Sequence, residues 1–381
     1  MREYVEIGIG REARRTYDLS RVSLVPTRRT RSSKDVDTTW HIDAYTFDIP
    51  FVSHPTDALA TPEFIIEMGK QGGLGVINAE GLWGRHEDLE GALEKVRTSP
   101  LSVLQELHAA PLNDELLAER ISQVRDSGVT VAVRVSPQNA REMAPKVIKA
   151  GAEILFIQGT MISAEHVAQG GEPLNLKEFI GELEVPVIAG GVMDYTTALH
   201  LMRTGAAGVI VGGGTNTNAL SLGIEVGLAT AIADVSAARR DYLDETGGRY
   251  VHIIADGEFS NSGDLAKAIA CGADAVELGQ LLANAKEAGG KGSYWPAVAG
   301  HPRFPRGLVE SLADFSDADF LTEEDEADAF EENSKTLEVI LHGPSSEPFG
   351  LENLVGGLKR AMAKCGYTDL KAFQKVGLSI Y

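Results

Sequence analysis

VHIIADGEFSNSGDLAKAIACGADAVELGQ (251–280) contains two short β-branched runs separated by a segment of helical period. The helical segment begins at Ser262 and ends at Gly272, a residue type that often follows a helix. A strand, a helix and a second strand in this order indicate a parallel strand pair joined by a crossover helix. This β-α-β unit is the element from which the rest of the fold is predicted.

The same alternation continues along the whole chain, in units of about 20 to 40 residues. The runs that we interpret as strands are IPFVS (49–53), LGVIN (74–78), VTVAVRVS (129–136), EILFIQG (153–159), VPVIAGG (185–191), GVIVGGG (208–214), VHIIADG (251–257) and AVELGQ (275–280). Eight parallel strands with crossover helices close a barrel. We therefore predict the α/β class and a single (β/α)8 TIM-barrel domain over 1–381.

Two segments refine this prediction. TPEFIIEMGKQGG (61–73) begins with Thr61 and Pro62, which are typical of a helix N-terminus. The acidic stretch 308–333 has little periodicity and follows the proline-rich WPAVAGHPRFPRG. We interpret it as a surface excursion or as a flap over the barrel mouth.

The composition excludes several classes of protein. A content of 43% hydrophobic and 24% charged residues is typical of a globular protein. A net charge of -20 disfavours nonspecific binding of nucleic acid. Two cysteines without metal-ligand spacing indicate a reducing compartment, and no metal site is predicted. Because no apolar run suggests a signal peptide or a membrane helix, we expect a cytoplasmic protein without membrane contact.

In a TIM barrel, the residues just after the strands converge on one mouth, where ligands bind. The predicted mouth residues are Ser53, His54, Asp57, Asn78, Glu80, Arg134, Ser136, Gln158, Gly159, Gly190, Gly191, Gly212, Gly213, Gly214, Thr215, Asn216, Asp256, Gly257, Glu258, Gly279 and Gln280.

Two glycine-rich loops are the main binding signal at this mouth. In VGGGTNTN (211–218), consecutive glycines let backbone amides approach and cradle an anion, although a tight turn without a ligand would have the same sequence. Asp256 ends an otherwise apolar strand, where its carboxylate would accept hydrogen bonds from ribose hydroxyls or cap the following helix.

Imidazole and guanidinium groups also lie near the predicted mouth. His54 and Asp57 follow the same strand, and we interpret them as an acid/base pair or as structural hydrogen-bonding partners. His301, Arg303 and Arg306 in HPRFPRG would bring positive charge suited to a phosphate, or would pair with the acidic stretch.

Three segments resemble the IMP dehydrogenase/GMP reductase family. They are TYDLSRVSLVPTRRTRSSKDVD (16–37) with IPFVSHPTDALATPEFIIEMGKQGGLGVIN (49–78), ADGEFSNSGDLAKAIACGADAVELGQLLA (255–283), and GPSSEPFGLENLVGGLKRAMAKCGYTDLKAF (343–373). More narrowly, HPRFPRG and the lack of the family cysteine resemble the IMP-dehydrogenase-like branch of actinobacteria and cyanobacteria. The chain has no room between its second and third strands for CBS modules.

The resemblance implies an NAD- or NADP-linked oxidoreductase of purine nucleotide metabolism, acting on IMP, XMP or GMP, and a homotetramer. The family's thiolate attacks the purine, and its position corresponds here to Asn216, or to Thr215 if the loop shifts by one residue. Neither side chain replaces a thiolate.

Further positions depart from the family pattern. Gly214 stands where the family has a phosphate-binding serine, and Gln280 stands where it has the serine of a Gly-Ser pair. Glu258 replaces a glycine of the family pattern, and Leu155 replaces a cofactor-contacting aspartate. We expect substrate contacts from Ser53, the glycine-rich loops with Asp256 and Glu258, Gly279, Gln280, His301, Arg303 and Arg306. The expected cofactor contacts are Gln158, Gly159, Gly190 and Gly191.

Three hypotheses remain open on the sequence. The first is the NAD(P)-linked oxidoreductase with a rearranged site. The second is a catalytically deficient homologue that acts as a regulator. It would bind either a nucleotide or a subunit of a true IMP dehydrogenase. The third is another barrel chemistry, for example with a flavin on the glycine-rich loops.

Overall fold

Eight parallel strands at the centre of the molecule form a barrel in the computed structural model, which describes residues 3–98, 101–165, 174–213, 217–311, 330 and 334–381. In spatial order the strands are β6 (Phe51–Ser53), β13 (Ala275–Leu278), β12 (His252–Asp256), β11 (Gly208–Val211), β10 (Val187–Val192), β9 (Ile154–Gln158), β8 (Ala132–Val135) and β7 (Val76–Asn78). The sheet closes through a parallel bridge between Val52 and Leu74, so that β6 lies beside the segment leading into β7. The predicted TIM barrel is confirmed.

Every predicted strand run overlaps an observed strand, and each observed strand is shorter than its run. Residues are lost at both ends, such as Val129 and Thr130 before β8 and Gly159 and Gly257 after β9 and β12. The residues that follow the strands belong to the loops of the mouth. Of the acidic stretch 308–333, β15 (Glu310–Ser311) pairs with β14 (Ser293–Tyr294), while 312–329 and 331–333 lie outside the described residues.

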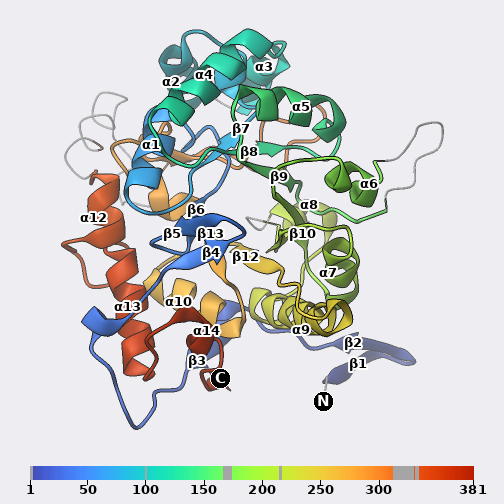
Figure 1. Cartoon of the computed structure of the whole chain (residues 1–381), viewed down its shortest axis with the longest axis vertical. Coiled ribbons are helices and arrows are strands. Elements are labelled where there is room, and N and C mark those ends of the chain that lie inside the picture. The colour runs from blue at the N-terminus through green and yellow to red at the C-terminus, as the bar shows by residue number, and fades with distance from the viewer. Residues whose placement is uncertain (1–2, 99–100, 166–173, 214–216, 312–329, 331–333) are drawn as a thin grey trace.

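Helices form an outer layer around the strands (Figure 1). Those along the barrel are α1 (Pro62–Lys70), α2 (Leu89–Arg97), α3 (Leu101–Ala109), α4 (Asp114–Asp126), α5 (Ala140–Ala150), α6 (Leu176–Gly181), α7 (Tyr195–Met202), α8 (Thr217–Leu222), α9 (Leu228–Thr246) and α10 (Ser262–Cys271). The C-terminal ones are α12 (Leu337–His342), α13 (Leu354–Lys364) and α14 (Leu370–Phe373). Within the described part of the chain, no helix is both long and apolar enough to cross a bilayer.

The helix ends follow the sequence signals. The hydroxyl of Thr61 accepts a hydrogen bond from the backbone N–H of Phe64 at 3.2 Å, as an N-cap does. α10 begins at Ser262 as predicted, and its side-chain cap is the preceding residue, Asn261. Gly272, at a φ of 127°, ends α10 in a conformation that favours glycine.

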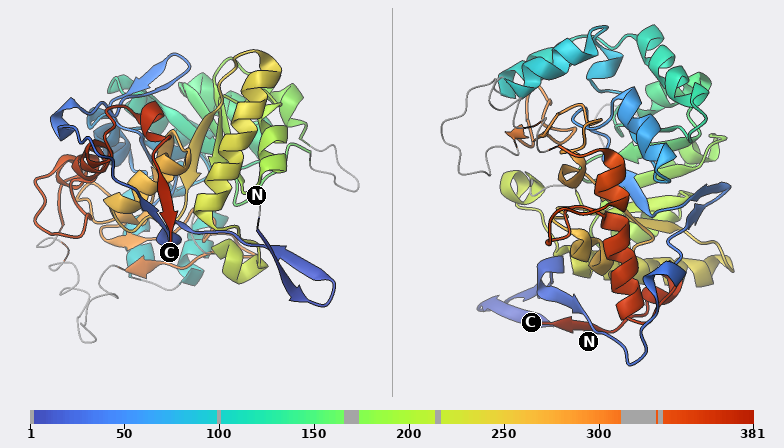
Figure 2. Two further views of the ribbon diagram at one scale, coloured as in Figure 1. Left: turned by 90° about the horizontal axis from the view of Figure 1, so that it is seen from below. Right: turned by 90° about the vertical axis from the view of Figure 1, so that its left-hand side faces the viewer.

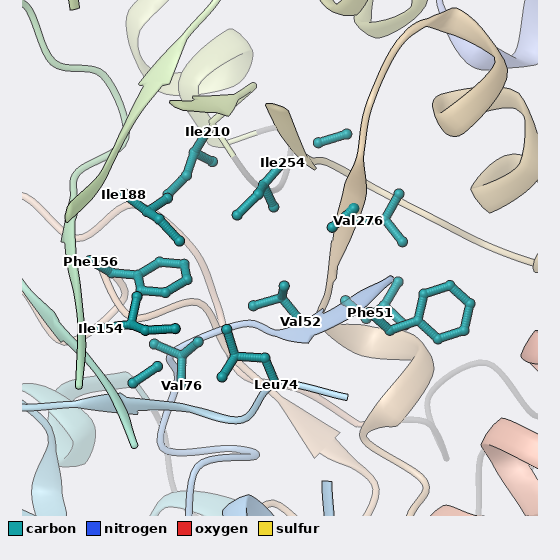
Figure 3. Close-up of a cluster of buried hydrophobic side chains, with 14 of the residues drawn as sticks. Phe51, Val52, Leu74, Val76, Ile154, Phe156, Ile188, Ile210, Ile254 and Val276 are labelled. Carbon is teal, nitrogen blue, oxygen red and sulfur yellow. The ribbon is translucent and has the colours of Figure 1, made fainter. Parts of the chain in front are cut away.

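Apolar side chains fill the interior of the barrel (Figure 3). Val52, Phe156, Ile188 and Ile254 point toward one another from different strands, and each is fully buried. Because the interior is packed, ligands are limited to the ends of the barrel.

Short antiparallel pairs decorate the barrel. β4 (Trp40–Ile42) pairs with β5 (Tyr45–Phe47), and β3 (Val22–Leu24) pairs with the C-terminal β16 (Leu378–Ile380). The hairpin of β1 (Tyr4–Gly8) and β2 (Arg11–Arg14) stands away from the barrel, and the two termini lie on the same side of the molecule (Figure 2).

A buried ion pair lies at the amino-terminal end of the barrel, opposite the mouth. Asp274, just before β13, accepts a hydrogen bond from Arg239 of α9 at 2.6 Å and one from Lys371 at 2.7 Å. Asp274 and Arg239 are 2% and 6% exposed. Burial alone would raise the pKa of Asp274, but Arg239 and Lys371 outweigh it and lower this pKa to about 2.

Candidate functional site

A cavity of about 350 Å³, partly open to solvent, lies at the carboxyl ends of β11 and β12. Its wall includes Gly212, Gly213, Gly257 and Asp256. Gly212 has a φ of 105°, and a Cβ there would lie 2.0 Å from the backbone oxygen of Asp256. The two glycine-rich loops predicted from the sequence therefore meet at one cavity, and the close approach of their backbones requires glycine.

The lining of this cavity is acidic. Besides Asp256 it includes Asp18, Glu225, Glu258 and Asp264, and the lining residues include no lysine, arginine or histidine. An isolated phosphate here would be repelled by these carboxylates. The positive field needed by an anionic ligand must come from a neighbouring part of the mouth.

A small cavity of about 30 Å³ adjoins the first, since both are lined by Gly213 and Asp256. Its other lining residues include His54, Arg134, Gln158, Gly159, Thr160 and residues 296–298. Asp256 therefore stands between two cavities and presents its carboxylate at their junction.

Four polar side chains form a buried cluster under this junction. The amide nitrogen Nε2 of Gln158 donates to both carboxylate oxygens of Glu277 at 3.0 Å and to Oδ2 of Asp256 at 3.4 Å. His54 Nε2 lies 3.9 Å from Oδ2 of Asp256. Gln158, Asp256 and Glu277 are 5%, 5% and 1% exposed, so water screens their charges little.

Burial shifts the titration of this cluster toward neutral forms. It raises the pKa of Asp256 to about 7. Burial, reinforced by the charge of Asp256, raises the pKa of Glu277 well above its usual range. Burial and the nearby charge of Arg134 lower the pKa of His54 to about 3. Burial also raises the pKa of Tyr294, which faces both carboxylates. Perturbed groups of this kind are enriched at functional sites.

Arg134 is the buried cation of the mouth. Its guanidinium donates to the backbone oxygen of Gln158 at 2.8 and 3.0 Å and lies 3.5 Å from a carboxylate oxygen of Glu80. Burial alone would raise the pKa of Glu80, but Arg134 and hydrogen bonds from Asn139 and Ser136 outweigh it and lower this pKa. Arg134 and Glu80 thus balance each other's charge. Through its bonds to Gln158, Arg134 also holds the end of β9 in place.

The structure places His54 and Asp57 with different partners. His54 faces Asp256, whereas Asp57 lies 3.3 Å from His108 of α3 and accepts a hydrogen bond from the backbone of Leu82 at 2.9 Å. Each of the two residues therefore has a partner other than the one that their spacing suggested.

Several predicted contact residues have structural roles. Ser53 is fully buried and accepts a hydrogen bond from the backbone of Val76 at 3.1 Å. A Cβ on Gly190 would lie 2.5 Å from the side chain of Ile210. A Cβ on Gly191 would lie 1.8 Å from the backbone oxygen of Gly212. Close packing of neighbouring strand ends therefore accounts for these glycines.

The remaining predicted residues lie around the rim. A Cβ on Gly279 would meet the hydroxyl of Tyr294 at 2.4 Å, and Gln280 is exposed. His301 and Arg303 are exposed as well. Arg306 donates to the hydroxyl of Thr160 at 2.7 Å, and within the described ranges no acceptor reaches its buried Nε.

Gly214, Thr215 and Asn216 lie outside the described residues. The chain's two cysteines lie elsewhere. Cys271 ends α10, next to the amino-terminal end of β13, and Cys365 follows α13. Burial raises the pKa of Cys271 to about 12 and also raises that of Cys365, so neither thiol is ionised at neutral pH.

Glu277, His108 and Tyr294 were not identified from the sequence. Glu277 carries a signal that was available, because it is the single charged residue within the apolar run AVELG. His108 and Tyr294 come from segments that only the fold brings to the mouth.

Known proteins provide an independent comparison. The family model described as "IMP dehydrogenase / GMP reductase domain" matches residues 15–378. A crystal structure of an IMP dehydrogenase/GMP reductase-like protein from Corynebacterium glutamicum is 68% identical, with a TM-score of 0.91 over 99% of this chain and 98% of that one. An uncharacterized oxidoreductase of Mycolicibacterium smegmatis is 58% identical over 99% of both chains.

More distant relatives have named activities. The inosine-5'-monophosphate dehydrogenase of Aquifex aeolicus is 26% identical over 85% of this chain and 63% of its own length. The family model covers nearly all of the barrel described above, and the near relatives match from end to end. The chain therefore belongs to the IMP dehydrogenase/GMP reductase family.

Proposed function

We propose that this chain is an NAD(P)-linked oxidoreductase that binds a purine nucleotide at the barrel mouth and works without a cysteine adduct. The observation that carries the proposal is the position of Asp256, buried at the end of β12 and shared by two adjoining cavities. In this arrangement the larger cavity holds the substrate, and the reactive end of the cofactor approaches it past the residues that line the smaller one.

Asp256 suits the ribose of a nucleotide. Its carboxylate would accept hydrogen bonds from two adjacent hydroxyls, and these bonds are strengthened by the low exposure of the site. Because the lining of the larger cavity is acidic, the phosphate would extend toward Arg306, beside Thr160.

The residues of the smaller cavity fit a dinucleotide cofactor. Arg306 has a buried N–H without an acceptor among the described residues, and Thr160, to which it is bonded, lines that cavity. NAD or NADP, when bound, supplies a hydride acceptor or donor. Arg306 would bind the phosphate of the substrate on this side of the mouth, and Gly159 would let the cofactor approach the end of β9.

The proposed reaction does not depend on a thiol. We expect the double variant Cys271→Ala and Cys365→Ala to keep nucleotide-dependent turnover within about twofold of the unchanged protein, because both cysteines lie away from the mouth. The measurement is the initial rate at the nicotinamide absorbance band, with thermal unfolding as a control for the fold. A loss of turnover of tenfold or more at unchanged stability would contradict this mechanism.

A catalytically deficient homologue that binds a nucleotide and regulates IMP dehydrogenase is the second candidate. The acidic cavity and the position of both cysteines favour it. The deciding experiment combines calorimetric titration with IMP, XMP and GMP and absorbance assays with each nucleotide and NAD, NADP or the reduced forms. Turnover supports the oxidoreductase. Binding without turnover for every combination supports the regulator. If no nucleotide binds and none is turned over, the purine-nucleotide site is rejected.

We also propose a homotetramer, on family resemblance. Size-exclusion chromatography with light scattering tests it, and a monomer at micromolar concentration would reject it.

A further inference from the structure

We propose that His54, Asp256 and Glu277 form a binding site for a divalent first-row metal ion such as Zn²⁺ or Mn²⁺. One imidazole nitrogen and one oxygen from each carboxylate lie within 4.8 Å of one another. The three residues come from the ends of adjacent strands, β6, β12 and β13, so the barrel itself holds them together. The site shares Asp256 with the proposed nucleotide site, but it goes beyond the proposed oxidoreductase function and its test does not use that function.

The charges around the cluster favour a cation. Arg134 is paired with Glu80, and Asp57 with His108, so these groups have partners of their own. Asp256 and Glu277 add two carboxyl groups that are 5% and 1% exposed. Two buried carboxylates at this separation repel each other unless a proton or a cation lies between them.

Gln158 provides a second, independent observation. Its Nε2 donates to both carboxylates, which orients them toward each other. The Oε1 of the same amide is buried, and no donor in the described part of the chain reaches it. Since Gln158 is only 5% exposed, this unmet acceptor is costly. A water bound to the metal ion would supply the missing hydrogen bond.

The geometry requires side-chain movement. Ligand atoms about 2.1 Å from a tetrahedral ion lie about 3.4 Å apart. His54 Nε2 and Asp256 Oδ2 are already 3.9 Å apart, and separations of up to 4.8 Å close with movements of under about 1 Å in each side chain. One nitrogen and two carboxylate oxygens, completed by water, suit Zn²⁺ or Mn²⁺ better than the soft ions that thiolates select.

Metal binding is tested on the full chain after removal of bound metal with EDTA. We expect ZnCl2 or MnCl2 alone, at about 100 times the dissociation constant, to raise the melting temperature by about 4 °C. Elemental analysis after desalting should show close to one ion per chain. Glu277→Gln keeps the shape of the side chain but removes its charge, and it should weaken binding at least tenfold and reduce the thermal shift by about half or more.

Glu258→Gln is the matched control, because Glu258 is exposed at the mouth and lies outside the cluster, so this variant should bind metal like the unchanged protein. His54→Asn removes the imidazole ligand and is a second test of metal binding. The melting temperatures of His54→Asn and Glu277→Gln in metal-free buffer report whether each variant folds. If Zn²⁺, Mn²⁺ and Mg²⁺ all leave the unchanged protein without a thermal shift or bound metal, the carboxyl pair holds a proton and the proposal is overturned. Undiminished binding by folded Glu277→Gln would overturn it as well.

Discussion

Replacing Asp274 with asparagine is expected to lower the free energy of unfolding by about 3 to 5 kcal/mol. The substitution leaves the buried guanidinium of Arg239 without its anionic partner, and unpaired buried charges cost this much. The same carboxylate also accepts hydrogen bonds from Tyr250 at 2.7 Å and from the backbone of Ile253 at 2.8 Å. Urea unfolding at neutral pH, followed by circular dichroism, measures the difference.

Glu245→Gln serves as the control, because Glu245 pairs with Arg203 at 2.7 Å on the exposed surface. Water screens that pair, so the unfolding curve should stay unchanged within error. Equal losses in the two variants would show that burial does not distinguish the pairs.

The Asp274 pair also predicts a dependence on pH. The pKa of Asp274 is about 2 in the folded chain, below its ordinary value of 3.8. Its contribution is therefore fully present above about pH 4 and is lost as the pH falls through 2. Unfolding measured from pH 6 downward should show a smaller loss over this window in Asp274→Asn than in the unchanged protein. Parallel curves would contradict the assignment.

Gly212→Ala is expected to lower the free energy of unfolding by about 2 to 5 kcal/mol. The new Cβ would lie 2.0 Å from the backbone oxygen of Asp256, and the φ of 105° is strained for alanine. Relief of this clash must move the end of β12, which carries Asp256. We therefore also expect purine-nucleotide affinity, measured by calorimetry, to fall at least tenfold.

Gly223→Ala separates the two causes. Gly223 has a φ of 66°, but nothing lies within 4 Å of the Cβ that alanine would add. This variant has the strain without the clash, so its cost should be about 1 kcal/mol, with unchanged nucleotide affinity. If both variants behave alike, backbone strain alone explains the requirement for glycine.

The barrel was predictable because each strand carries its own local signal. Runs such as EILFIQG and GVIVGGG combine β-branched residues with a glycine or polar end, and the strands β9 and β11 lie within them. Some carboxyl ends, such as that of GVIVGGG, were overestimated because glycine continues an apolar run in the sequence while adopting loop conformations in space. Gly212, at a positive φ directly after β11, is an example.

The candidate site was only partly predictable. Asp256 stands out at the end of an apolar strand, and the structure places it where two cavities meet. The partners of His54 and Asp57 were not predictable from spacing, because Asp256 and His108 reach them across long stretches of sequence. The metal site now proposed was not expected either, since His54 lies about 200 residues before Asp256 and Glu277, and only the closure of the barrel brings it to them.

The way the barrel closes has a consequence for its synthesis. β6, near residue 51, pairs with β13, near residue 276, and β3 pairs with the C-terminal β16. A ribosome delivers the chain from its N-terminus. The backbone groups of β6 that pair with β13 therefore remain unpaired while the more than 200 residues between the two strands are made. An open strand edge can pair with another chain. The nascent chain thus passes through a stage in which its first barrel strand needs protection, for example by a chaperone, until the last barrel strand emerges.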